Sequence, residues 1–146
     1  MHSPHGALLG VGLALGLAGC ATVPDASYIA SSKPADNQVI ASAVSSYLGT
    51  AYPPGGTTLV IQPVASGSAP LLDQLAVDLR AQGFAIAQPN SGASDAQTVR
   101  LIVSLNFGGC VVRVDYGSQE AGTFFGRNVS GSLQLSSPFV VREVTQ

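Results

Sequence analysis

Charged residues are scarce in this sequence. Only 10 % of its 146 residues are Asp, Glu, Lys or Arg, against about 25 % in an average soluble domain. The six basic residues stand singly and form no stripe, which excludes nucleic acid as a direct ligand. Because a soluble monomer usually carries more surface charge, we expect partner chains or a membrane to cover part of this surface.

The first 23 residues contain no Asp, Glu, Lys or Arg, and such a start predicts a secretory signal. Every residue from Ala7 to Cys20 is Ala, Leu, Val, Gly or Cys, a run shorter than the roughly 20 residues that a membrane-spanning helix needs. The run ends in Leu17-Ala18-Gly19-Cys20, which resembles the lipobox of bacterial lipoproteins. We therefore predict a signal peptide over residues 1–19. Cys20 is the predicted lipid attachment residue, carrying a diacylglycerol and an N-acyl chain.

The N-terminal segment also allows a second interpretation. Residues 1–5 contain no Lys or Arg, so their positive charge comes from the α-amino group and partly charged histidines. An uncleaved anchor from Ala7 to about Val23 would sit at the lower limit of a spanning length. In either case the remaining chain lies outside the cytoplasm. Ala21, where an Asp would favour inner-membrane retention, predicts an outer-membrane lipid anchor with its domain in the periplasm.

Cleavage before Cys20 would leave little catalytic equipment. It removes both histidines, His2 and His5, and leaves Cys110 as the only unmodified thiol. This excludes an intramolecular disulfide, a Ser–His or Cys–His nucleophile pair and a thiolate zinc site. Cys110 lies in an apolar strand, which favours a buried thiol over a redox-active one. We predict no catalytic, metal-binding or cofactor-binding residue, no cofactor and no enzymatic activity.

A carboxylate pair would be the remaining simple catalyst. Asp73 and Asp78 lie five residues apart, about 140° around a helix, and do not face each other. All the acids are predicted to be solvated surface residues: Asp25, Asp36, Asp73, Asp78, Asp95, Asp115, Glu120 and Glu143.

Two segments have the apolar periodicity of helices. Residues 36–48 place their apolar side chains on one stripe, with Asp36 suited to the N-cap and Gly49 to the C-terminal end. Residues 70–82 repeat the pattern more strongly, and Gly83 can end that helix in a left-handed conformation. The predicted buried stripe of the second helix is Leu71, Leu72, Leu75, Ala76 and Leu79.

The rest of the chain has the pattern of β-structure. Residues 99–107 alternate with one fully apolar face, and Gly108-Gly109 predicts a hairpin to a strand over 110–116. Residues 121–126 have the composition of a glycine-flanked connection. Further strands are predicted at 57–62, 84–87, 128–135 and 139–141. This order predicts an α+β fold, a single small domain with a mostly antiparallel sheet and two helices on one face.

The predicted domain is preceded by a linker. Residues 20–34 are small and polar with no periodicity, and we interpret them as a lipidated flexible tether that could reach about 45 Å. Tyr28-Ile29 is its one apolar pair and is either incidental or a small docking peg for a partner. The predicted organisation is thus 1–19 signal peptide, 20–34 tether and 35–146 periplasmic α+β domain.

Two passages resemble the TrbH-type conjugal transfer lipoproteins. The run Leu75-Ala76-Val77-Asp78-Leu79-Arg80-Ala81-Gln82-Gly83-Phe84-Ala85-Ile86 is similar to that family's helix–Gly–aromatic–strand passage. The stretch from Gly126 to Pro138, with Arg127, its alternating small residues and its Ser-Pro, is similar to the family's C-terminal end. The resemblance implies a place in a type IV secretion apparatus for conjugation. Small lipoproteins there anchor the outer-membrane core complex and contact its other subunits, in a multi-copy ring.

Three functions are compatible with these observations. The first is a structural lipoprotein of a multi-subunit envelope machine, which the resemblance favours. The second is a free-standing periplasmic binding lipoprotein for a small ligand or peptidoglycan, and the third is an envelope enzyme. The size of the native detergent-solubilised species separates the first from the second.

Overall fold

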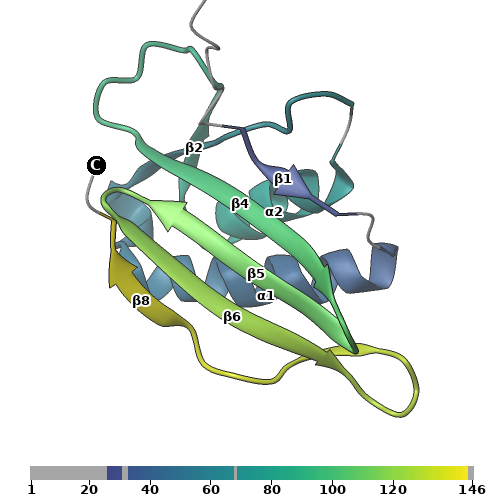
Figure 1. Ribbon diagram of the computed structural model, residues 1–146. Helices are drawn as coiled ribbons and strands as arrows, with labels where there is room; N and C mark the ends of the chain where they lie inside the picture. Colours follow the sequence, from purple (N-terminus) through teal and green to yellow (C-terminus); the bar gives the residue numbers. More distant parts are fainter. Residues whose placement is uncertain (1–25, 31–32, 68, 145–146) are drawn as a thin grey trace, which may run out of the picture.

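The computed structural model describes residues 26–30, 33–67 and 69–144, and these form an eight-stranded sheet with two α-helices on one face (Figure 1). This confirms the predicted single α+β domain with a mostly antiparallel sheet. The predicted signal peptide and Cys20 lie outside the described residues. The helices are α1 (Pro34–Ala51) and α2 (Pro70–Ala81), and the strands are β1 (Tyr28–Ile29), β2 (Thr58–Ile61), β3 (Ala85–Ala87), β4 (Gln97–Asn106), β5 (Gly109–Tyr116), β6 (Gln119–Arg127), β7 (Leu133–Leu135) and β8 (Val140–Glu143).

Three long strands organise the sheet. β4, β5 and β6 form an antiparallel meander, and the strand order is β3-β2-β4-β5-β6-β7. The outer edge of β4 is shared by two parallel strands, with β2 along its first half and β1 along its second. The outer edge of β6 is likewise shared by β8 and β7, both antiparallel. Short strands therefore flank both sides of the meander.

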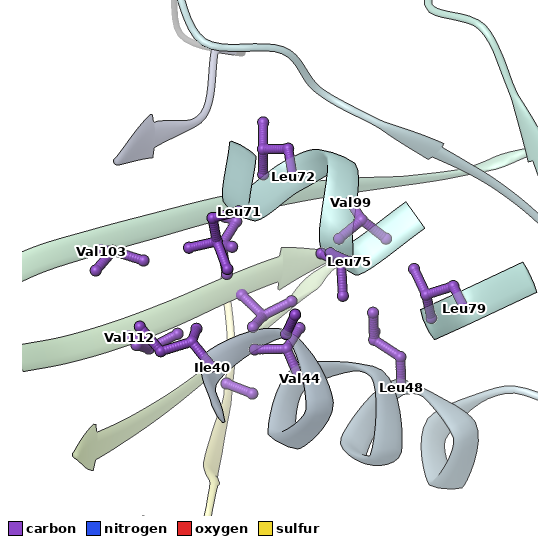
Figure 2. Close-up of a cluster of buried hydrophobic side chains, with 14 of the residues drawn as sticks. Ile40, Val44, Leu48, Leu71, Leu72, Leu75, Leu79, Val99, Val103 and Val112 are labelled. Carbon is purple, nitrogen blue, oxygen red and sulfur yellow. The ribbon is translucent and has the colours of Figure 1, made fainter. Parts of the chain in front are cut away.

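The core lies between the meander and the helices. Side chains from α1, α2 and the strands meet in one cluster, as Figure 2 shows for Val44, Leu75 and Val99. Leu71, Leu72, Leu75 and Leu79 are buried, as predicted for the second helix, whereas Ala76 is only partly buried. Gly83 adopts φ +101°, and the Phe84 N–H bonds the Leu79 carbonyl at 3.1 Å, so the predicted left-handed end is confirmed.

The first helix is longer than predicted at both ends. It begins at Pro34, with Lys33 at the N-cap position and no side-chain cap, so the prediction of Asp36 as N-cap is wrong. It also continues through Gly49 to Ala51, and Pro53-Pro54 follow. A Cβ at Gly49 would meet the Gln82 side chain at the end of α2, which indicates that this glycine accommodates the packing of the two helices.

The second half of the sheet departs from the prediction in two places. Residues 121–126, interpreted as a connection, are the middle of β6, because its glycines fit a strand packed between β5 and the β7/β8 edge. The predicted strand 128–135 is reduced to β7. Asn128 holds residues 128–132 in a turn, its side-chain oxygen accepting the N–H groups of Ser130 and Ser132 at 3.0 Å each.

Tyr28-Ile29 is part of the fold. The pair forms β1, parallel to β4, in register with Ile102 and Val103. The Ser27 hydroxyl donates to the Gln62 carbonyl at 2.6 Å and accepts the Leu101 N–H at 3.1 Å. The prediction that the whole of 20–34 is a flexible tether is therefore wrong for these residues, and the pair is not incidental to the fold. A docking role for the exposed Tyr28 side chain stays a prediction.

Candidate interaction surface

Cys110 lies in the core rather than at a reactive site. It is 2 % exposed on β5, which confirms the predicted buried thiol. Burial, and the negative charge of Asp36 nearby, raise the pKa of the Cys110 thiol. A protonated and enclosed thiol is a poor nucleophile.

Asp36 does not face solvent, contrary to the prediction for all the acids. It is 5 % exposed, and the Arg127 guanidinium donates to its two oxygens at 2.8 and 3.2 Å. The hydrogen bond from Arg127 holds the pKa of the Asp36 carboxyl below its ordinary value, against the opposing effect of burial. Arg127 also donates to the Gly131 carbonyl at 2.8 Å. One arginine thus ties the start of α1 to the end of β6 and to the following turn.

A row of charges crosses the sheet face opposite the helices. Arg100, Asp115, Glu120 and Arg142 are successive register partners on β4, β5, β6 and β8. Arg100 pairs with Asp115 at 2.8 Å, and Arg142 pairs with Glu120 at 2.7 Å. Asp115 and Glu120 are therefore half-buried members of ion pairs, not isolated solvated acids. Asp73 and Asp95 are exposed as predicted.

An uncharged groove runs beside α1. Its volume is about 730 Å³, and it lies between α1 and the C-terminal segment. Tyr47 of α1 stacks on Phe139 with ring centroids 4.4 Å apart, and its hydroxyl is hydrogen-bonded to that of Tyr116. The groove is lined by Gln38, Val39, Ser42, Ala43, Ser46, Tyr47, Thr50, Phe125, Leu135 and Phe139. These side chains suit contact with an apolar surface.

The two most exposed of the large apolar side chains lie at one end of the sheet. Phe107 lies in the β4–β5 turn and Val129 in the β6–β7 turn, and both are fully exposed. Leu105, predicted to lie on a fully apolar inner face, is 62 % exposed near this end of β4. We call the turns at residues 107–108 and 128–132 the loop tips.

Two features are absent from the described ranges. No group of three or more His, Cys, Asp or Glu side chains that could hold a metal ion occurs within them. Neither helix in this part of the chain has the length and apolarity to span a membrane. The ion-paired acids Asp36, Asp115 and Glu120 each face an arginine, so these pairs fix structure.

Comparison with known proteins relates the chain to DNA transfer. Residues 22–143 match a family described as "Conjugal transfer protein TrbH". No curated protein and no solved structure matches the chain. The match covers nearly all the residues that form the fold, including both passages that resemble the family.

Proposed function

Since the chain belongs to the TrbH family of conjugal transfer proteins, we propose that it is a structural lipoprotein of a conjugative type IV secretion system. In this role it anchors and stabilises the outer-membrane core complex. The family match over residues 22–143 carries the proposal, because it connects the whole described fold with conjugal transfer.

Three further observations support an anchoring role. Leu17-Ala18-Gly19-Cys20 supplies a lipid attachment residue ahead of the fold. A low content of charge suits a domain whose surface is covered in its working state. The groove beside α1 and the loop tips are uncharged and apolar, as expected of surfaces that contact other subunits. We propose that the protein acts without a cofactor and catalyses no reaction.

The anchor is tested by metabolic labelling in donor cells. Wild-type protein is expected to incorporate labelled palmitate and to fractionate with the outer membrane. Cys20→Ser should abolish the labelling and leave an unprocessed or soluble form. Labelling that persists in Cys20→Ser, or fractionation of the wild type with the inner membrane, would contradict the proposed anchor.

The structural role is tested by assembly and transfer together. Deletion of the gene should lower conjugation frequency, and mild detergent extraction of wild-type cells should yield the protein in a species much larger than a monomer. A monomer in detergent, together with normal transfer in the deletion strain, would favour a free-standing periplasmic binding lipoprotein.

A further inference from the structure

We propose that the loop tips are a docking surface for a protein of the periplasm that offers an uncharged, apolar pocket. The proposal rests on the lipid anchor at Cys20 and goes beyond it by naming the surface and the chemistry of its partner. Phe107 is 102 % exposed and Val129 is 110 % exposed, so both side chains stand clear of the domain. They add nothing to its core.

Both loop tips are held rigid by an asparagine. The Asn106 side-chain oxygen accepts the Phe107 N–H at 2.7 Å. The Asn128 side-chain oxygen accepts the N–H groups of Ser130 and Ser132 and the Ser130 hydroxyl at 2.6 to 3.0 Å. An apolar side chain on a fixed turn loses little conformational freedom on binding, which favours a contact residue.

The two loop tips form one unit. The Arg127 N–H bonds the Gly108 carbonyl at 2.8 Å and so joins the β6–β7 turn to the β4–β5 turn. The Arg127 side chain fixes the same turn to α1 through Asp36 and Gly131. Phe107 and Val129 are therefore presented together from a common base, as in Figure 1, where both turns lie at the same end of the sheet.

The partner's chemistry follows from the absence of charge. No Asp, Glu, Lys or Arg occurs in residues 101–112 or 128–141. The charges nearest the loop tips lie at their base, where Asp36 pairs with Arg127 and Lys33 is near enough to help lower the Asp36 pKa. The tips themselves offer a charged partner no counter-charge, and an apolar pocket would bury two exposed hydrophobic side chains.

The direction of the chain favours a protein over the lipid bilayer. β1 is parallel to β4, and the loop tips lie beyond the C-terminal end of β4, so Ala26 and Ser27 lie toward the opposite end. Tyr28 is level with Ile102, which places Ala26 about 23 Å from Phe107 along the strand direction. The stretch from Cys20 to Ala26 spans at most about 22 Å when extended. Insertion of the loop tips into the bilayer that holds the Cys20 lipids would thus require this stretch to run fully extended back along the sheet, which disfavours the bilayer as the occupant.

Site-specific photocrosslinking tests the partner. The full-length lipidated protein carries p-benzoylphenylalanine at position 107 in donor cells, with the same probe at position 77 as control, because Val77 is 56 % exposed on α2. An adduct with a protein encoded by the transfer system is expected at 107 and not at 77, and its loss when that protein's gene is deleted identifies it. Adducts with phospholipid only, adducts of twice the chain mass only, or no adduct would overturn the proposal.

A paired substitution tests the function of the surface. Phe107→Ser combined with Val129→Ser should lower conjugation frequency about tenfold or more, as loss of apolar contact residues does. Thermal stability and palmitate labelling should stay at the wild-type level, because neither side chain is in the core. Val77→Ser is the matched control and should leave transfer unchanged. Normal transfer in the double variant would overturn the proposal, whereas lost labelling of the wild type would contradict the anchor instead.

Discussion

At the residue scale, the ion pair between Arg127 and Asp36 should be the polar contact most sensitive to substitution. Arg127→Gln leaves a carboxylate that is 5 % exposed without its counter-charge. We expect unfolding free energy to fall by about 1–3 kcal/mol, less than for a fully buried pair, because the arginine is partly exposed. Urea unfolding measures this change in the unfolding free energy. Arg142→Gln is the control and should change stability by less than about 1 kcal/mol, because the Arg142 side chain is 67 % exposed and Glu120 keeps Arg113 at 3.9 Å. Equal losses in the two variants would contradict this.

The ion pair of Asp36 with Arg127 also predicts that the stability of the fold depends on pH. Arg127 lowers the pKa of Asp36 in the folded state. In the unfolded chain the pKa of Asp36 returns to about 3.9. The stabilisation is therefore complete above about pH 4 and is lost as pH falls through the lower folded value. Asp36→Asn should lower stability at pH 7 and flatten its fall below pH 4 in urea titrations. If the stability of Asp36→Asn fell below pH 4 as steeply as that of the wild type, other carboxyl groups would be responsible for the fall.

Two glycines on adjacent strands should differ sharply in tolerance. A Cβ at Gly109 would overlap the Phe125 carbonyl oxygen on β6 and approach the Phe124 ring at 2.9 Å, whereas nothing lies within 4 Å of a Cβ at Gly122. Gly109→Ala is expected to lower the unfolding free energy by about 1–3 kcal/mol or more. Gly122→Ala should stay within about 0.5 kcal/mol of wild type. The thermal unfolding midpoints of the two variants test this difference. Equal midpoints would mean that β5 and β6 do not approach each other as closely at Gly109.

The contacts between residues follow less directly from the sequence than the elements do. A hairpin turn at 107–108 fixes the register of β4 and β5, and that register alone pairs Arg100 with Asp115. The predicted turn at Gly108-Gly109 lies one residue later and would have paired Arg100 with Gly117, so the sequence predicted the hairpin but not this contact. The contact of Asp36 with Arg127 spans 91 positions. It depends on how α1 packs under the end of β6, which no local pattern encodes.

At the scale of elements, the second helix has a defined buried face. Leu75 and Leu79 are fully buried against α1 and the sheet. Leu→Ala at either position should lower the unfolding free energy by about 2–5 kcal/mol through lost burial and the cavity left behind. Val77→Ala, on the exposed side of the same helix, should stay within about 0.5 kcal/mol. Denaturant unfolding gives all three values, and a small loss at Leu75 would refute the packing of α2.

Periodicity predicted the elements that bury a single face, and failed where other effects dominate. α2, β4 and β5 agree with the prediction because apolar side chains recur at helical or strand spacing. β6 was missed because its glycines suggested a connection, although neighbouring strands on both sides stabilise it. The turn at 128–132 was missed because its apolar alternation suits a strand, while the Asn128 side chain stabilises a turn instead.

At the scale of the whole molecule, the start of the described chain and the proposed contact surface lie toward opposite ends of the sheet. The described chain enters through β1 on one side of the sheet, and the loop tips lie at the end toward which β1 runs. The two helices cover one face, and paired charges occupy the other. A rigid domain of this kind can hold one partner at a fixed distance from a lipid anchor. Such a function needs stable geometry and no reacting group.

The proposed absence of catalysis predicts which substitutions affect DNA transfer. A catalytic carboxylate would be indispensable, but Asp73 is exposed, Asp78 accepts a hydrogen bond from Gln74, and Asp115 and Glu120 pair with arginines. Asp73→Asn, Asp78→Asn, Asp115→Asn and Glu120→Gln should therefore leave transfer at the wild-type level, since each keeps a polar side chain of the same size and partly exposed ion pairs contribute little to stability. Cys20→Ser should reduce transfer, because the domain loses its anchor. Conjugation frequency in a deletion strain complemented by each variant is the measurement, with assembly followed on native gels. If one carboxylate substitution abolished transfer while assembly stayed intact, a chemical role for that residue would replace the structural one.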